Sequence, residues 1–430
     1  MELQRLSRLR TLRRTAARSA DALVVGAGPA GIAAVGCLID AGLRVSWVDD
    51  GRFEGGALAR YRDVPANTKV DVLEALGGPD FLPGGLPTGS EAQAALETMK
   101  ATSQALNLAH DPAALGWTGL DSCHDFFTAL TASLLSHERC VAVRGRVDAL
   151  HTDAGYPKDG MAIWRARLCG SARDAFELGA PAVVLATGAE PLPAPAELQP
   201  SSWACEAADQ PRVLPVEQAL QLTRLRGMVQ AHETVGVVGG GHTGLVVAMH
   251  LSESLCVRST RLYVRRPIRL AQWDPAAGAY GAWGFRGLKG KAASFAIERG
   301  IVGKEPAATP SPPARPPPTI ELLDARKLRS CAATASGLDA VVFCLGFGAP
   351  PLPHVVRGAA PVSIATHQSP GGALIDASGR RLRGLFGLGL GFADSEFSSG
   401  CAYAEAGFMP FAVRAREIAD RVVRRLSTTT

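Results

Sequence analysis

The stretch DALVVGAGPAGIAAVGCLIDAGLRVSWVDD, from Asp21 to Asp50, decides the fold of this chain. It opens with a short apolar strand, Ala22–Val25, and continues with the spacing G-x-G-x-x-G at Gly26, Gly28 and Gly31. In such a turn the first glycine makes the bend and the second lets backbone approach a pyrophosphate. The third lets the following helix sit close to the strand, so that the helix N-terminus faces the phosphates.

The residues around these glycines complete a nucleotide site. Pro29 and Ala30 stand inside the motif, where the helix starts, and we expect them beside the phosphates. A second strand, Arg44–Val48, leads to Asp49, whose carboxylate can accept hydrogen bonds from a ribose hydroxyl. A glycine-rich turn without a ligand would not account for Asp49. The order of strand, glycines, helix, strand and acid therefore predicts a dinucleotide-binding fold.

The pattern returns in the stretch ETVGVVGGGHTGLVVAMHLSE, which spans residues 233–253 and carries the same spacing at Gly239, Gly241 and Gly244. The next strand, RLYVRRP, reaches Arg265 and Arg266 instead of an acid. Two guanidinium groups can bind a 2′-phosphate, so the pair favours NADPH over NADH. The alternative is a pair of solvated surface arginines.

Two further strands end in glycine at the edge where an open α/β sheet binds its ligands: AVVLATGAEP, residues 182–191, which turns at Thr187 and Gly188, and DAVVFCLGFGAPP, residues 339–351. A last strand, GLFGLGLGFAD, residues 384–394, turns at Gly389. Elsewhere, apolar spacing predicts helices over 121–136 and about 401–426, and alternating strands near 141–150 and 161–168.

The order of these parts predicts an α/β protein with two Rossmann-like domains, the second inserted in the first. Two nucleotides that face each other across such a pair of domains can exchange a hydride. The expected parts are a basic leader over 1–20, a first domain over 21–210 plus 346–430, and a second domain over 211–345.

These motifs, in this order, resemble the pyridine nucleotide–disulfide oxidoreductase superfamily of flavoproteins. The resemblance covers nearly everything after residue 20, and Thr187 and Gly188 match the family's "ATG" strand end. It implies that the first domain holds FAD, through the first set of glycines and Asp49, and that the second holds NAD(P)H. About 40 residues follow the last strand, as in the shorter thioredoxin reductase-like layout, so we do not expect the dimerisation domain of glutathione reductase-like enzymes.

The chain departs from the superfamily where the latter carries a redox-active pair of cysteines. Aligned on the retained Val64 and Pro65, the two cysteine positions fall on Leu58 and Asp63. A thiolate beside the flavin passes electrons to a disulfide, and neither residue can do that. Disulfide reduction is therefore not expected. In addition, Gly389 is followed by leucine, where the superfamily commonly has an aspartate that binds the FAD ribityl chain.

The segment RDVPANTK, residues 62–69, should run beside the flavin ring by its position in the superfamily. Asn67 and Thr68 could hydrogen-bond ring heteroatoms, and Lys69 could stabilise negative charge near the reduced flavin. We therefore take these residues as the catalytic candidates. Alternatively, Asn67 and Thr68 cap the helix expected to follow, since both residue types are good N-caps.

The expected function is that of an FAD-dependent NAD(P)H oxidoreductase, which passes a hydride from NADPH to FAD and on to a non-disulfide acceptor. A flavin-dependent monooxygenase of a small molecule is the alternative. A second alternative is a non-catalytic FAD-binding protein, but a structural flavoprotein has no need of the second nucleotide fold. The substrate or electron acceptor is left open by these residues.

Charge is concentrated at the front of the chain, where six arginines stand among the first twenty residues. The rest carries equal numbers of basic and acidic residues, which argues against a nucleic-acid partner. The leader is acidic-poor with leucines at helical spacing, so we expect import into an organelle, with the mitochondrion first. A cytoplasmic or plastid location is the alternative.

The nine cysteines include no C-x-x-C pair, so no metal site and no disulfide framework are expected. The apolar stretch 22–48 is interrupted by glycines, proline and charges, so it reads as a buried strand and helix rather than a membrane span. A homodimer is a possible assembly.

Overall fold

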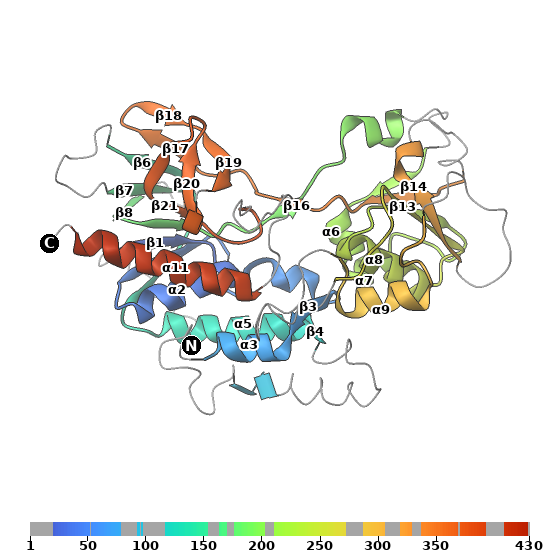
Figure 1. Cartoon of the computed structure of the whole chain (residues 1–430), viewed down its shortest axis with the longest axis horizontal. Helices are drawn as coiled ribbons and strands as arrows, with labels where there is room; N and C mark the ends of the chain where they lie inside the picture. The colour runs from blue at the N-terminus through green and yellow to red at the C-terminus, as the bar shows by residue number, and fades with distance from the viewer. Residues whose placement is uncertain are drawn as a thin grey trace.

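The chain folds into two units of sheets and helices joined by narrow connections (Figure 1). The computed structural model describes residues 20–51, 53–78, 93–94, 96–97, 117–153, 163–169, 176–202, 210–271, 287–305, 319–328, 337–368, 370–392 and 408–428. Residues 1–19 of the leader and the stretch 393–407 thus lie outside the described residues.

The first unit is built on a seven-stranded sheet in the order β19-β20-β21-β9-β1-β2-β5. Its strands are β1 (Ala22–Val25), β2 (Val45–Asp49), β5 (Cys140–Arg144), β9 (Val183–Leu185), β19 (Ile364–Gln368), β20 (Ala373–Asp376) and β21 (Arg381–Gly387). The run from β21 to β5 is parallel, and β1 and β9 are buried throughout. Continuous apolar strands of this kind suit a parallel sheet that is covered on both faces.

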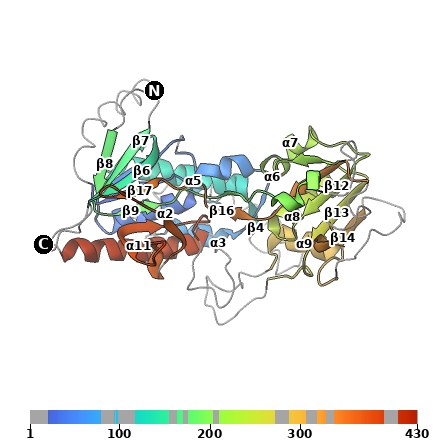
Figure 2. The same ribbon diagram turned by 90° about the horizontal axis from the view of Figure 1, so that it is seen from above.

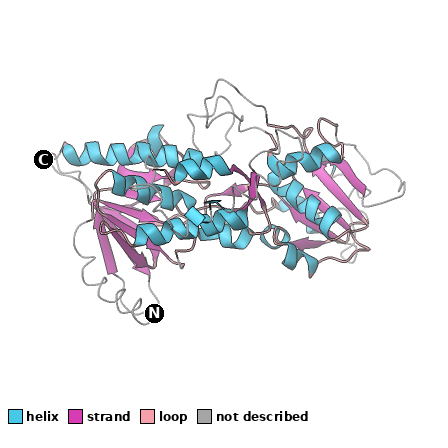
Figure 3. Ribbon diagram, turned by 90° about the horizontal axis from the view of Figure 1, so that it is seen from below, coloured by secondary structure: helices cyan, strands magenta, loops and turns pink. Residues whose placement is uncertain are grey.

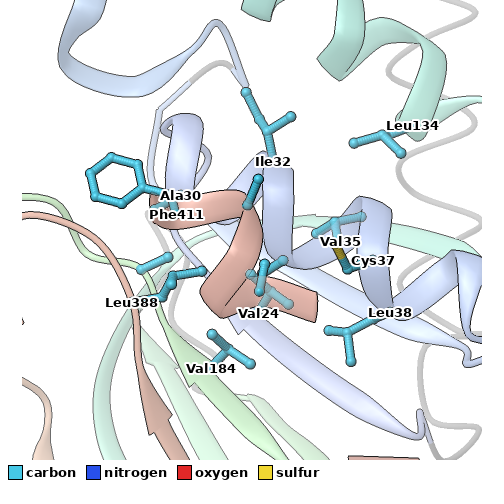
Figure 4. Close-up of a cluster of buried hydrophobic side chains, with 14 of the residues drawn as sticks. Val24, Ala30, Ile32, Val35, Cys37, Leu38, Leu134, Val184, Leu388 and Phe411 are labelled. Carbon is cyan, nitrogen blue, oxygen red and sulfur yellow. The ribbon is translucent and has the colours of Figure 1, made fainter. Parts of the chain in front are cut away.

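Helices cover one face of this sheet. They are α2 (Pro29–Asp40), α3 (Val70–Leu76), α5 (Leu120–Leu135) and α11 (Phe408–Ser427). Figure 4 shows Val24 and Val184 from the sheet in the same apolar cluster as Val35 of α2 and Phe411 of α11. The predicted helix over 121–136 corresponds to α5. The predicted terminal helix is described only from Phe408 onward, and its expected start near 401 lies outside the described residues.

A second, five-stranded sheet covers the other side, in the order β18-β17-β6-β7-β8. Its strands are β6 (Arg146–Thr152), β7 (Trp164–Cys169), β8 (Phe176–Ala180), β17 (His354–Arg357) and β18 (Ala360–Val362). The predicted strand near 141–150 is in fact divided at Gly145, because β5 pairs with β2 whereas β6 pairs with β7 and β17. Apolar side chains of both sheets share one core, which includes Leu23, Val183 and Trp164.

The second unit holds a five-stranded parallel sheet in the order β11-β15-β12-β13-β14. Its strands are β11 (Arg212–Leu214), β12 (Thr234–Val238), β13 (Ser259–Val264), β14 (Thr319–Asp324) and β15 (Ala340–Phe343). Its helices are α6 (Val216–Ala219), α7 (Leu222–Arg226), α8 (His242–Met249) and α9 (Gly290–Glu298), and α8 continues into a π-helical turn, His250–Ser254. Figure 3 distinguishes the strands of both units from the helices packed against them.

Short elements join the units. The chain leaves the first unit through β10 (Glu190–Pro191) and returns through β16 (Phe347–Gly348), and the two strands pair antiparallel. A second two-stranded sheet, β3 (Pro65–Lys69) with β4 (Trp117–Gly119), lies between the units in two views (Figures 1 and 2). The remaining short helices are the 3-10 turns η1 (Gly56–Tyr61), η3 (Ala196–Leu198), η4 (Pro200–Ser202), η8 (Ala325–Lys327) and η9 (Pro370–Gly372).

Among the described residues, none of the helices has the length and apolar character needed to cross a membrane.

Candidate functional site

In the first glycine-rich turn, between β1 and α2, two of the three glycines lie against backbone atoms and the remaining one faces free space. Gly26 has φ of +111°, and a Cβ there would lie 2.2 Å from the backbone oxygen of Ala186. A Cβ on Gly31 would lie 1.9 Å from the oxygen of Gly26. A Cβ on Gly28, in contrast, would meet nothing within 4 Å. The chain itself therefore requires the first and third glycines, whereas Gly28 faces free space of the kind a ligand needs.

The N-terminus of α2 points into this free space. Gly28 is its N-cap, Pro29 occupies the first turn and Ala30 follows, and no side chain caps the helix. Proline is suited to the first helical turn because the N–H group it lacks would have no helical partner there. The other N–H groups of this turn, together with the helix dipole, form a site for an anion such as a pyrophosphate.

Asp49 ends β2 beside the turn, as the sequence predicts. Its carboxylate accepts hydrogen bonds from the backbone N–H groups of Ala27 at 2.7 Å and Gly51 at 2.8 Å. Burial raises the pKa of Asp49, and these two hydrogen bonds oppose that rise. The indole N–H of Trp47 donates to the oxygen of Gly26 at 2.9 Å. Strand β2 thus fixes both the turn and the acid that would bind the ribose.

The ends of β9 and β21 meet the same turn. Gly188, after β9, has free space around its Cβ position, while a Cβ on Gly391 would lie 2.3 Å from the oxygen of Gly188. A Cβ on Gly389, after β21, would lie 3.0 Å from the Cβ of Ala30. The hydroxyl oxygen of Thr187 is buried and has no hydrogen-bond partner within the described part of the chain. A bound FAD fits this arrangement, because it would bring hydrogen-bonding groups to a buried hydroxyl that lacks them.

Replacing Thr187 with valine tests this assignment. A buried hydroxyl without a partner costs free energy, so we expect the ligand-free Thr187→Val chain to be more stable than the parent by about 1 kcal/mol. FAD should then bind about 5- to 10-fold more weakly, since the hydroxyl's hydrogen bond is lost. Thermal unfolding of the ligand-free protein and FAD titration measure the two effects. A loss of stability together with unchanged FAD affinity would contradict the assignment.

The second glycine-rich turn repeats the geometry of the first. A Cβ on Gly239 would lie 2.2 Å from the oxygen of Cys344, and one on Gly244 would lie 1.8 Å from the oxygen of Gly239. A Cβ on Gly241 would meet nothing within 4 Å, as at Gly28 in the first turn. Both turns therefore leave the same middle position open to a ligand.

The groups beside the second turn are basic. Arg265 and Arg266 directly follow β13 and are exposed, and neither forms an ion pair with any residue that the structure describes. His242, the first residue of α8, accepts a hydrogen bond at Nε2 from the backbone N–H of Lys289 at 3.0 Å. Burial lowers the pKa of His242, which keeps the ring neutral. The arrangement offers two cations and a helix N-terminus to a phosphorylated nucleotide.

The catalytic candidates are placed by their backbone only. Asn67, Thr68 and Lys69 lie in β3, and their side chains lie outside the described residues. Helix α3 begins at Val70, so Lys69 precedes it directly and neither Asn67 nor Thr68 stands at the cap position. The helix-cap interpretation of these two residues is therefore wrong, and their contact with the flavin stays a prediction.

The three buried thiols that the structure describes in the first unit are poorly suited to disulfide exchange. Burial raises the pKa of Cys37, Cys123 and Cys140 to about 12, so these residues stay protonated at neutral pH. Asp63 occupies the position of the second family cysteine, and its carboxylate accepts a hydrogen bond from the backbone N–H of Leu222. The expectation that the chain does not reduce disulfides stays a prediction.

The structure also adds residues that the sequence did not reveal. A Cβ on Gly56 would lie 2.7 Å from the Cα of Gly28, so the glycine pair after Asp49 packs onto the first turn. His124 of α5 approaches the same loop, since its Cδ2 would lie 3.8 Å from a Cβ on Gly55. The glycine pair is a signal that sequence reading could have used, whereas His124 stands too far along the chain to be connected with it.

Comparisons with known proteins extend these findings. The chain is 26% identical over 394 residues to the monooxygenase AgnR1 of Paecilomyces divaricatus, a match that covers 88% of this chain and 92% of that protein. Among solved structures, the ornithine N-hydroxylase of Kutzneria sp. 744 is similar with a TM-score of 0.58 at 15% identity. The match covers 95% of this chain and 100% of the hydroxylase chain. A flavin-containing monooxygenase from Stenotrophomonas maltophilia has a TM-score of 0.55 at 19% identity, with 95% and 99% covered.

These structural neighbours share the two-unit α/β architecture, so the predicted fold is confirmed. The sequence profile of the pyridine nucleotide-disulphide oxidoreductases matches residues 20–280, which is more than half of the chain and includes both glycine-rich turns. The chain therefore belongs to the pyridine nucleotide-disulphide oxidoreductase family.

Proposed function

We propose that this protein is a flavin-dependent monooxygenase that binds FAD in the first unit and takes its electrons from NADPH in the second. The observation that carries the proposal is the pair of equivalent turns, open at Gly28 and Gly241, with an acid beside the first and arginines beside the second. An acid suits a free ribose and arginines suit a 2′-phosphate. One chain thus offers separate sites for two different dinucleotides.

The comparisons favour a monooxygenase over the reductase that the sequence first suggests. AgnR1, matched over most of both chains, is a monooxygenase, and the Kutzneria enzyme was solved with reduced FAD, NADP⁺ and L-ornithine. Leu58 and Asp63 occupy the positions where a disulfide reductase carries its cysteines. Molecular oxygen is a diffusible oxidant that requires no such thiol relay.

The residues of the first unit would hold FAD as follows. The N–H groups at the start of α2 bind the pyrophosphate, Asp49 binds the adenosine ribose, and the Thr187 hydroxyl gains its missing partner. Bound FAD supplies a group that accepts a hydride and, once reduced, reacts with dioxygen. The overall reaction balances as NADPH, a proton, dioxygen and substrate giving NADP⁺, water and the oxygenated substrate.

The side chains of this chain act by binding and orienting. The N-terminus of α8 and the two arginines after β13 would hold the phosphates of NADPH. If Lys69 lies beside the flavin, as its position predicts, its ammonium group would stabilise the negative charge that hydride transfer brings to that place.

The purified full-length protein tests the proposal. We expect a yellow protein that NADPH bleaches under argon, faster than NADH does. On admission of air without substrate, the reduced protein should consume one dioxygen and release one hydrogen peroxide for each NADPH oxidised. If NADPH leaves the protein yellow, the non-catalytic alternative holds. If menadione reoxidises the protein rapidly and dioxygen only slowly, the protein is a reductase.

A further inference from the structure

The segment Arg60–Val64, here called the clasp, leaves the first unit at the end of η1 and lies against the second unit. We infer that the clasp fixes the position of the NADPH-binding unit relative to the FAD-binding unit, with Asp63 as its main positioning residue. The existence of this tie does not depend on the proposed function. Its effect on hydride transfer rests on that function.

Polar contacts join the clasp to the second unit. The Asp63 carboxylate accepts a hydrogen bond from the backbone N–H of Leu222, the first residue of α7, at 2.9 Å. The hydroxyl of Tyr61 donates to Glu217 of α6 at 3.3 Å. Arg60 also approaches Glu217, at 3.9 Å, but this pair is exposed and long and contributes little. Both hydrogen bonds go to a carboxylate, but the Asp63 contact is the shorter one, so it is the principal contact.

His250 lies near the clasp, in the π-helical turn that continues α8, and it is buried there. Burial lowers the pKa of the ring, while the proximity of Ala219 and Asp63 opposes this shift. The helix that would bind the NADPH phosphates at its N-terminus thus continues into a turn that lies close to Asp63.

Apolar packing supports these contacts. The rings of Tyr61 and Phe347 meet edge to face, with centroids 6.3 Å apart. Tyr61 and Val64 both pack against the buried core of the second unit. Phe347 belongs to β16, the strand through which the chain returns to the first unit. The clasp therefore contacts both the second unit and the connection that joins the two units.

The clasp is equally bound to the first unit, which a tie between the two units requires. Arg62 donates to Nδ1 of His124 on α5 and forms an ion pair with Asp125 at 2.8 Å. The backbone N–H of Leu120, where α5 begins, donates to the oxygen of Val64 at 2.9 Å. Tyr61, Asp63 and Val64 of the clasp thus contact the second unit, whereas the Arg62 side chain contacts the first.

Hydride transfer depends on how the two units are placed, and the clasp restricts that placement. The nicotinamide and the flavin must meet at about 3–3.5 Å, and a misplacement of about 1 Å can reduce the rate on the order of 100-fold. Strands β10 and β16, which lie in the two connections between the units, are each only two residues long and pair with each other. The clasp adds a contact at the α6–α7 side, which restricts rotation about that two-stranded connection.

Distance measurements on the ligand-free chain test the tie. Cys169 and Cys256 are exposed thiols, one in each unit, and can carry spin labels. Cys205, Cys331 and Cys401, outside the described residues, would be replaced by serine. The variant Asp63→Ala removes the acceptor, Asp63→Asn keeps one, and Asp153→Ala removes an exposed carboxylate that pairs only within the first unit.

We expect a narrow distance distribution for the parent, for Asp63→Asn and for Asp153→Ala, and a broad or displaced one for Asp63→Ala. Flavin reduction by saturating NADPH should then slow about 10-fold in Asp63→Ala, with FAD content and NADPH affinity unchanged. A narrow distribution in Asp63→Ala overturns the inference, and so does a broad one with an unchanged reduction rate. If the protein binds no FAD, the proposed function fails, but the distance distributions still decide whether the clasp holds the units.

Discussion

The variant Gly28→Ala is expected to fold normally and to be purified without FAD. The backbone at this position, with φ of −79° and ψ of 179°, accepts any residue, and the new methyl group would touch no protein atom within 4 Å. The methyl would instead occupy the space where the pyrophosphate approaches the backbone. Because forcing a methyl group into a close contact costs about 1–3 kcal/mol, FAD should bind about 5- to 150-fold more weakly. Circular dichroism and the ratio of flavin to protein absorbance measure folding and occupancy.

The matched control is the equivalent change in the second turn. Gly241→Ala should keep its FAD, because only the NADPH site is narrowed, and should show a correspondingly higher Kd for NADPH. Gly31→Ala should fail to fold or lose thermal stability, since its methyl would stand 1.9 Å from the oxygen of Gly26. If Gly28→Ala retains FAD with parental affinity, the first turn is not the pyrophosphate site.

The double variant Arg265→Ala, Arg266→Ala is expected to lose its preference for NADPH. Hydrogen bonds to charged groups contribute about 1.5–3 kcal/mol, so NADPH should bind about 10- to 100-fold more weakly. NADH carries no 2′-phosphate and should be affected little. Stopped-flow reduction of the flavin under argon, with each nucleotide at several concentrations, gives the two affinities.

Arg226→Ala serves as the control, because Arg226 is an exposed arginine of the same unit at the end of α7. It should leave both affinities unchanged. Equal losses for NADPH and NADH in the double variant would mean that the arginines act on something other than the 2′-phosphate. Raising the salt concentration should weaken NADPH binding in the parent more than in the double variant, since exposed charge pairs are screened.

The parts of the site that follow from local chain geometry could be predicted from the sequence. Glycine is required at positions 26 and 31 because the strand and the helix approach each other so closely there. This requirement appears in the sequence as the G-x-G-x-x-G spacing. Asp49 is predictable for the same reason, since it lies one strand beyond the turn. The structure places these residues together as expected.

The parts that depend on distant contacts could not be predicted. Asp63 accepts a hydrogen bond from Leu222, which lies 159 residues further along the chain, and nothing in the local pattern around Asp63 indicates this partner. The strand divides at Gly145 because β5 pairs with β2 in one sheet and β6 pairs with β7 in the other, and the sequence does not show these pairings. The glycine within the alternating run did, however, indicate a bend or bulge. The helix cap was misjudged because β3 pairs with β4 through Lys69, and this pairing outweighs the capping preference of Asn67 and Thr68.

The pairing of β10 with β16 has a consequence for how such proteins can be rebuilt. The backbone N–H of Leu192 donates to the oxygen of Gly346 at 2.9 Å, so the outgoing and returning chains are within one hydrogen bond of each other. A hairpin turn of a few residues could bridge that distance, and the whole intervening segment could then be removed or exchanged for one from a relative. The preference for NADPH or NADH could thus be changed by exchanging the second unit as one segment, provided that the new segment also supplies a hydrogen-bond donor to Asp63.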